Sequence, residues 1–175
     1  MMRRRTLTRL IVSPVAVGAL AAGGLAVGGL AGCGPAVPSE PFLPIAVRLS
    51  GDTVEIVHTD CHPVGVEQVF IVRPDPKDTV IKDSDPVVWR ESFHPPSTAA
   101  SFTAGTTHGD PQDIPLAAPL GADTSYAAFL KLADGSSAHA SFQISKLGGG
   151  RVSHNGRYQT AEEFAKEWPC RSGGP

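Results

Sequence analysis

The sequence predicts a mainly β protein, in which an antiparallel β-sandwich is followed by a short C-terminal helix. Three observations support this fold class. The 175 residues include 19 Gly and 16 Pro, a composition that disfavours long helices and favours short strands joined by turns. About seven β-rich runs recur at regular spacing, with turn residues between them. Two of these runs flank Asp134-Gly135 and alternate between apolar and polar residues, as strands with one buried face do.

The first strands are predicted from β-rich runs and the residues that interrupt them. Ser50-Gly51-Asp52 lies between two such runs and indicates a hairpin. Pro74 should end the third run, and Pro95-Pro96 the fourth, because proline has no N–H to donate to a neighbouring strand. Residues 105–119 should be mostly loop. The predicted strands are 45–49, 53–58, 66–73, 87–92 and 100–103.

The two runs around Asp134-Gly135 predict a hairpin with one apolar face. An Asp-Gly turn between two runs of period two is a strong hairpin signal. Because successive side chains of a strand point to opposite faces, every second residue should face the core. These residues are Tyr126, Ala128, Leu130, Leu132, Ala138, Ala140, Phe142 and Ile144.

The last predicted element is a short helix. Thr160 and Glu163 are spaced as a capping box, in which each side chain accepts a hydrogen bond from the other residue's backbone N–H. Pro169 should end the helix. The apolar residues after the cap recur at helical spacing and should dock the helix on the sandwich. These residues are Ala161, Phe164, Ala165 and Trp168.

The segment from Leu120 to Leu130 resembles strand F of immunoglobulin-like and fibronectin type III domains. The resemblance rests on Leu120, Thr124, Tyr126 and Leu130, and it implies that the Tyr hydroxyl bonds back to the backbone. The chain departs from the immunoglobulin pattern in the spacing of Trp89 and in the late position of Cys170.

The N-terminal part has the features of an export signal. Residues 1–9 are basic, and residues 10–30 form an uncharged apolar run, as in a secretory signal peptide. The run is long enough to permit a membrane span instead, although its glycines and Pro14 weaken a helix. Under either interpretation the basic end stays in the cytoplasm and the rest lies outside.

Leu30-Ala31-Gly32-Cys33 resembles the lipobox of bacterial lipoproteins. This resemblance implies that residues 1–32 are a removed signal peptide, and that Cys33 receives a diacylglycerol and becomes the new N-terminus. Two or more acyl chains hold a protein stably at a membrane. The expected location is therefore the extracytoplasmic face of the cell membrane. The chain also resembles the small lipoproteins common in high-GC Gram-positive bacteria, which implies a location and no activity.

The remainder of the chain divides into a tether, a domain and a tail. Residues 34–44 contain four prolines, and with Cys33 they should form a stiff tether, unless Phe42 and Leu43 pack on the domain. Residues 45–170 form the predicted single domain, and residues 171–175 a disordered tail.

Cys61 and Cys170 are the two cysteines left after Cys33. Because disulfides persist outside the cytoplasm, their pairing is the simplest interpretation. The alternative of metal-ligating or redox thiols lacks a close C-x-x-C spacing. A bridge would close a loop of about 110 residues, which is worth on the order of 4 to 5 kcal/mol.

The charge of the exported part disfavours nucleic acid and anionic lipid headgroups as partners. Four arginines precede Cys33, so the rest has 11 basic and 17 acidic residues and a formal charge of −6. Binding to phosphates requires the opposite sign.

Two groups of residues have side chains that could bind a metal ion. His58, Asp60, Cys61 and His62 are all potential ligands, but an oxidised Cys61 could not ligate, and an exposed loop is the simpler interpretation. Four aspartates could hold calcium, although solvated turn carboxylates are far commoner. They are Asp75, Asp78, Asp83 and Asp85.

The sequence offers little for catalysis. Asp134, Ser137 and His139 supply the residue types of a hydrolase, but neighbouring hairpin positions point to alternating faces, and a G-x-S-x-G turn does not occur. Glu163 and Glu167 lie one helical turn apart, as solubilising charges would. Gly148 to Gly150 lacks the Lys that a phosphate-binding loop needs.

These observations favour a lipid-anchored, non-catalytic binding module of the bacterial envelope, with an unknown protein or envelope ligand and without a cofactor. Two alternatives from other classes stay open. The first is an extracytoplasmic metal-binding protein that uses the region of His58, Asp60 and His62. The second is a small secreted hydrolase.

Overall fold

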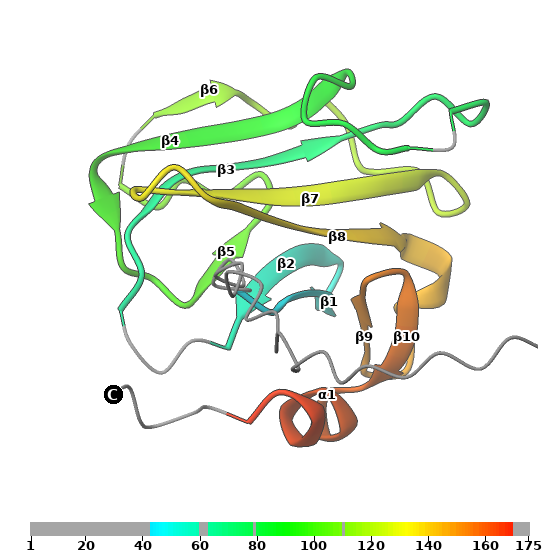
Figure 1. Cartoon of the computed structure of the whole chain (residues 1–175). Coiled ribbons are helices and arrows are strands. Elements are labelled where there is room, and N and C mark those ends of the chain that lie inside the picture. Colours follow the sequence, from blue (N-terminus) through cyan, green and yellow to red (C-terminus); the bar gives the residue numbers. More distant parts are fainter. Residues whose placement is uncertain (1–42, 60–62, 79, 110, 170–175) are drawn as a thin grey trace, which may run out of the picture. The chain divides into compact units, whose positions relative to one another are not determined.

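Two antiparallel five-stranded sheets pack face to face, and one helix lies against one of them (Figure 1). The computed structural model describes residues 43–59, 63–78, 80–109 and 111–169. The first sheet contains β1 (Ile45–Ser50), β2 (Thr53–His58), β5 (Ser101–Thr103), β9 (Arg151–His154) and β10 (Arg157–Thr160). The second contains β3 (Val66–Val72), β4 (Val87–Ser97), β6 (Gln112–Ile114), β7 (Ser125–Leu132) and β8 (Ser137–Gln143). The helix is α1 (Ala161–Glu167), and η1 (Ile144–Lys146) is a 3₁₀ turn.

The two antiparallel sheets confirm the predicted β-sandwich, and their strand order is compatible with an immunoglobulin-like arrangement. The first sheet runs β10-β9-β1-β2-β5 and the second β6-β4-β3-β7-β8. Immunoglobulin domains place strands A, B and E in one sheet and C, F and G in the other. Here β1, β2 and β5 take the first set of positions, and β3, β7 and β8 take the second. The β9–β10 hairpin and the strands β4 and β6 extend this arrangement at the sheet edges.

The core between the sheets is built mainly from alternate residues of the strands. The predicted apolar face of β7 and β8 is confirmed at Tyr126, Leu130 and Phe142, which are buried in the main cluster with Trp89 and Phe102. The Ser50–Asp52 and Asp134–Gly135 turns lie in the hairpins β1–β2 and β7–β8, as expected. Fully burying such side chains contributes about 1.5 to 3 kcal/mol each.

The prediction that Pro95-Pro96 ends the fourth strand is wrong, because β4 continues to Ser97. The register explains why prolines are tolerated there. Gln68 pairs with Ser92 and Val66 pairs with Ser97, with a shift between the two pairs. The prolines therefore lie in an irregular stretch, where the missing N–H leaves no regular β3 partner unpaired.

The β9–β10 hairpin was not predicted, although its turn is visible in the sequence. Asn155-Gly156 connects the two strands, and both residues have positive φ, 49° and 75°, as a type I′ turn requires. The short β6 was likewise expected to be loop. It is a three-residue strand that pairs with β4 at Arg90 and Glu91, and so few residues carry no readable alternation.

Side chains of the β9–β10 hairpin also bond to the edge of the other sheet. The Ser153 hydroxyl donates to the Ser141 carbonyl at 2.5 Å, and the Tyr158 hydroxyl accepts from the Gln143 N–H at 2.7 Å. Both backbone groups belong to β8, the last strand of its sheet. The hairpin thus joins the two sheets along one side of the sandwich.

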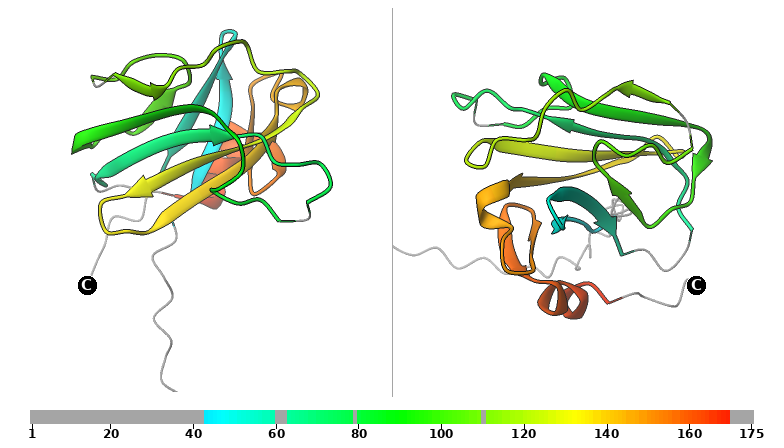
Figure 2. Two further views of the ribbon diagram at one scale, coloured as in Figure 1. Left: turned by 90° about the horizontal axis from the view of Figure 1, so that it is seen from above. Right: turned by 180° about the vertical axis from the view of Figure 1, so that it is seen from behind.

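The outer faces of both sheets are partly covered. On the first sheet, α1 buries Phe164 against Ala46 and Val152, on the side away from the second sheet (Figure 2). The capping box of Thr160 and Glu163 is present as predicted. Ala165 is exposed, contrary to the prediction for the apolar stripe, because contact with a sheet reaches only the side of this short helix around Phe164.

On the second sheet, directly paired residues of three strands form a stacked row. The rings of Phe70 and Phe129 lie 5.0 Å apart, and His139 stacks on Phe129 at 5.2 Å. Arg90 and Lys131 place their cations over Phe70. The two phenylalanines are buried although they do not face the main core.

The tyrosine corner implied by the immunoglobulin resemblance is present. The Tyr126 hydroxyl accepts a hydrogen bond of 2.9 Å from the Gly121 N–H. Gly121 is also the residue that this close approach requires, since a Cβ there would lie 2.9 Å from the Thr124 hydroxyl.

Tyr126→Phe should lower the free energy of unfolding by about 1 kcal/mol, because it removes one hydrogen bond and little packing. Urea denaturation measures this change. Amide exchange at Gly121 should also become faster. Tyr158→Phe is the matched control and should leave exchange at Gly121 unchanged. If Tyr126→Phe altered neither quantity, the bond would contribute nothing to this loop.

Candidate functional site

The two ends of the sandwich differ in which strands begin and end there. The chain enters the domain at Leu43, which is buried in the core, and β1 then runs to the turn at Gly51. That turn lines one pocket with Ile144, the residue after β8, and so lies at the end of the sandwich where β3 ends, β7 begins and β8 ends. This end, which we call the loop end, is therefore opposite to the end where the chain enters the domain.

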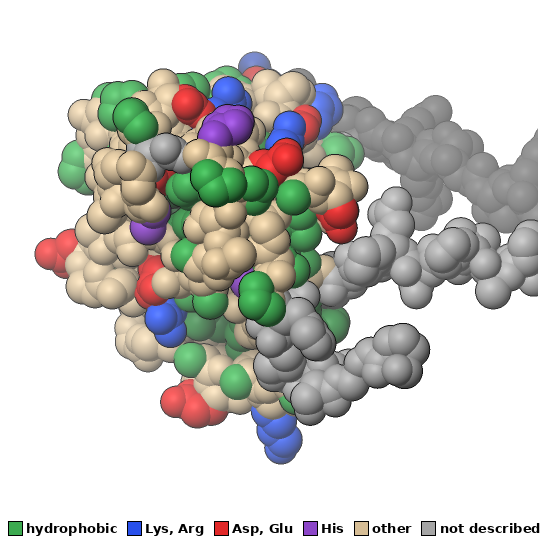
Figure 3. All heavy atoms as spheres, turned by 90° about the vertical axis from the view of Figure 1, so that its left-hand side faces the viewer, with side chains coloured by type: hydrophobic (Ala, Val, Ile, Leu, Met, Phe, Trp, Pro, Cys, Tyr) green, Lys and Arg blue, Asp and Glu red, His purple; other side chains and the backbone are tan. Residues whose placement is uncertain are grey.

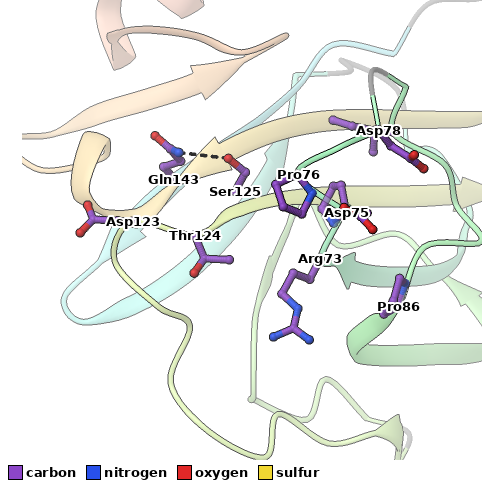
Figure 4. A pocket seen from close by; sticks show the side chains of 11 residues that line it. Arg73, Asp75, Pro76, Asp78, Pro86, Asp123, Thr124, Ser125 and Gln143 are labelled. Atoms are coloured by element: carbon purple, nitrogen blue, oxygen red, sulfur yellow. Dashed lines mark hydrogen bonds between the residues drawn. The ribbon is translucent and has the colours of Figure 1, made fainter.

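A groove of about 950 Å³ lies at the loop end, between two walls (Figure 4). One wall is the β3–β4 loop, and the other is the start of β7 with the end of β8. Its volume is in the range of small-ligand sites. The lining residues are Arg73, Pro74, Asp75, Pro76, Asp78, Ile81, Pro86, Asp123, Thr124, Ser125 and Gln143.

Local turn contacts hold the β3–β4 wall in place. The Arg73 N–H donates to the Pro86 carbonyl at 2.9 Å and closes the base of the loop. Asp75 accepts from the Lys77 N–H at 2.9 Å, and Asp85 accepts from the Lys82 N–H at the same distance. Aspartates that accept from a backbone N–H two or three residues away stabilise turns. The wall is therefore a series of fixed turns.

The opposite wall offers hydroxyl and amide groups. The Gln143 amide donates to the Ser125 hydroxyl at 3.0 Å, and Figure 4 shows this bond beside Asp123 and Thr124. The Gln143 backbone N–H is already bonded to Tyr158, which fixes the end of β8. Within the described residues, the Ser125 hydroxyl hydrogen and the side-chain carbonyl oxygen of Gln143 have no partner, and both could bind a ligand.

The groove contains one cation and three carboxylates, from Arg73 and from Asp75, Asp78 and Asp123. Asp78 forms an ion pair with Lys82 at 3.3 Å. Within the described residues, no hydrogen bond or ion pair occupies the side chain of Arg73 or that of Asp123. In Figure 4 the Arg73 side chain extends away from Asp78. Both charges are thus open to solvent and to a ligand.

A second, apolar pocket of about 440 Å³ lies at the same end of the sandwich. It is formed by the β1–β2 turn, the end of β5 and residues 116–120. The opposite end has a different surface. Acidic and basic side chains are interspersed there among apolar ones, without a field of one sign (Figure 3).

Glu91 and His108 form the most deeply buried titratable pair among the described residues. The Glu91 side chain is 0% exposed, and its two oxygens accept from the His108 N–H at 2.6 Å and from His108 Nδ1 at 2.8 Å. His108 Nε2 accepts from the Thr103 N–H at 2.9 Å. A histidine whose second nitrogen already holds a backbone N–H has no lone pair left for a substrate. The pair therefore joins β4 to β5, and His108 is not arranged to act as a general base.

The structure describes only some of the residues that the sequence predicts for lipidation, the disulfide and metal binding. Cys33, Asp60, Cys61, His62 and Cys170 lie outside the described residues, as do the predicted leader, most of the tether and the tail. His58 is buried in β2 and donates from Nε2 to the Ala99 carbonyl at 3.0 Å. Its Nδ1 has no partner within the described residues.

The four aspartates of the β3–β4 loop have separate contacts. Asp75 and Asp85 hold turns, Asp78 pairs with Lys82, and Asp83 pairs with Lys131 at 3.4 Å. Within the described part of the chain, no three metal-ligating side chains converge. The sequence pattern of an acidic loop thus corresponds to turn contacts and ion pairs.

The residues considered for hydrolysis also have other contacts. Asp134 accepts from the hydroxyl and the N–H of Ser136, and the hydroxyl bond is the main reason why the pKa of Asp134 is lowered. His139 stacks on Phe129. Glu163 caps α1, and Glu167 pairs with Arg157 at 3.5 Å.

Sequence reasoning missed the groove, because its walls come from segments about 50 residues apart. The local signals were Pro74, Pro76 and Pro86, which frame a rigid polar loop. None of the helices in the described residues is long and apolar enough to span a membrane. Comparisons with protein-family models, curated proteins and solved structures find no match to this chain.

Proposed function

We propose that this chain is a lipid-anchored, non-catalytic binding module of the bacterial cell envelope, whose ligand site is the groove of Arg73 and Asp123. The observation that carries the proposal is the position of this groove. It lies at the end of the sandwich opposite to Leu43, where the chain from Cys33 enters the domain. Anchoring at Cys33 would leave this end accessible to other envelope components.

The proposed anchor is tested by intact-mass analysis of the chain purified from membranes in detergent. The wild type should begin at Cys33 and carry at least two acyl chains. Cys33→Ser should lack the added lipid mass, because the hydroxyl replaces the thiol that is acylated. A wild-type product that retains residues 1–32, or that begins at Cys33 without lipid, would contradict the anchor.

The proposed binding end is tested by co-sedimentation of the detergent-purified chain with washed envelope fragments of the source bacterium. Ser125→Trp places a large ring in the groove and should weaken binding about tenfold, a loss of about 1.4 kcal/mol. Ser137→Trp is the matched control, because Ser137 is an exposed residue at the opposite end of the β7–β8 hairpin. Equal binding of both variants would place the interaction elsewhere.

The proposed disulfide between Cys61 and Cys170 is supported by the residues that precede each cysteine. Val57 in β2 and Trp168 after α1 pack against the same cluster, which contains Phe164. The His154 ring contacts Trp168 at 5.3 Å. The segments of Val57 and Trp168, which lead to the two cysteines, therefore both lie at the outer face of the first sheet. A bridge would fix the C-terminal segment to the domain.

A further inference from the structure

The charges of the groove restrict the chemistry of its ligand. A purely anionic ligand would be attracted by Arg73 but repelled by three aspartates, and a purely cationic ligand would meet the Arg73 guanidinium. Like charges held close together cost free energy, whereas a carboxylate on an arginine forms a charge-assisted, often bidentate, hydrogen bond. A ligand with both signs avoids either conflict.

The uncharged part of the lining suits a short peptide. Ser125 and Gln143 present a hydroxyl donor and an amide oxygen, which are suitable partners for peptide N–H and C=O groups. Pro76 and Pro86 offer rigid apolar rings on the facing wall. The volume of about 950 Å³ accommodates a few residues, and it is too small to enclose a folded domain.

We infer that the groove binds a short peptide end that carries both a free α-carboxylate and a basic side chain. The carboxylate pairs with Arg73, and the ammonium group pairs with Asp123, whose carboxylate lines the facing wall and has no ion pair within the described residues. This inference rests on the proposed function and specifies its ligand. The formal charge of −6 on the chain after Cys33 assists the approach of the basic side chain.

Three N-acetylated tripeptides test the inference. The first is alanyl-lysyl-alanine with a free carboxylate, which has both charges. The second is its C-terminal amide, which has only the cation, and the third replaces lysine by glutamine and has only the anion. Titration into ¹⁵N-labelled chain in detergent, followed through backbone amide shifts, should show the zwitterion binding about tenfold more tightly than either relative. The shifts should centre on Arg73, Ser125 and Gln143.

Two groove variants assign the charges. Arg73→Gln should abolish the preference for the free carboxylate over the amide, and Asp123→Asn should abolish the preference for lysine over glutamine. Arg151→Gln and Asp52→Asn change exposed residues outside the groove and should keep both preferences. Each variant alters one charge on the surface and should retain the fold. The positions of the backbone amide signals check that it does.

Two results would overturn the inference. In one, none of the three peptides shifts the groove amides. In the other, the amide binds as well as the free acid, which would make the groove a general acidic surface. If either occurred while Ser125→Trp still weakened envelope binding, the ligand class would be wrong and the proposed function would stand. If the wild type itself did not bind envelope fragments, both the ligand class and the proposed function would be wrong.

Discussion

Glu91→Gln should destabilise the domain by about 1 to 3 kcal/mol, because it leaves a buried hydrogen-bond donor of His108 without its acceptor. His108 Nε2 accepts from the Thr103 N–H, so the ring hydrogen is on Nδ1 and points to Glu91. A glutamine amide has one acceptor for two donors, the His108 backbone N–H and Nδ1–H. If the ring hydrogen moved to Nε2, it would face the Thr103 N–H, so that two donors would point at each other.

Urea denaturation of Glu91→Gln measures this effect, with Glu67→Gln as the control at an exposed position of β3. The control should stay within about 0.5 kcal/mol of the wild type. His108→Ala should also destabilise the domain, and the double variant should cost much less than the two single changes combined, since they remove the same interaction. Additive losses would show that the two side chains are not coupled.

Reduction of the proposed Cys61–Cys170 disulfide should lower the free energy of unfolding by about 4 to 5 kcal/mol in the chain-entropy model, because the closed loop spans about 110 residues. The double variant Cys61→Ser, Cys170→Ser should unfold at the same urea concentration with and without dithiothreitol. The wild type should match it only after reduction.

Peptide mapping under non-reducing conditions locates the bond directly. We expect one cross-linked peptide that joins the segments around Cys61 and Cys170. Cys33→Ser should leave this peptide unchanged, because the thiol at position 33 takes no part in it. Recovery of Cys61 and Cys170 as free thiols would exclude the bridge and would return them to the pool of potential metal ligands.

The features that the sequence predicted well are those with local causes. The Asp134-Gly135 turn and the alternation on either side of it fall within 20 residues, and the capping box of Thr160 and Glu163 within four. Each depends on neighbours in the chain, so a pattern in the sequence reports it directly. The same holds for Tyr126, whose hydroxyl bonds only five residues back.

The features that escaped prediction depend on distant partners. Glu91 is a charged residue in a strand, and only the approach of His108 across the sandwich explains its burial. The prolines of β4 are tolerated because β3 leaves them unpaired, which the chain alone does not reveal. Arg73 and Asp123 belong to different loops, and their common groove exists only after the sheets have packed. Asn155-Gly156 differs, because an Asn-Gly pair is a local signal for a hairpin turn.

The hydrogen bonds from Ser153 and Tyr158 to β8 have a consequence for the proposed anchoring of many copies of this chain on one membrane. A bare edge strand is a template on which a neighbouring molecule can add its own strand. Here the carbonyl of Ser141 and the N–H of Gln143 are already occupied. Under the proposed anchoring, crowding of copies in two dimensions should therefore not lead to self-association along this edge.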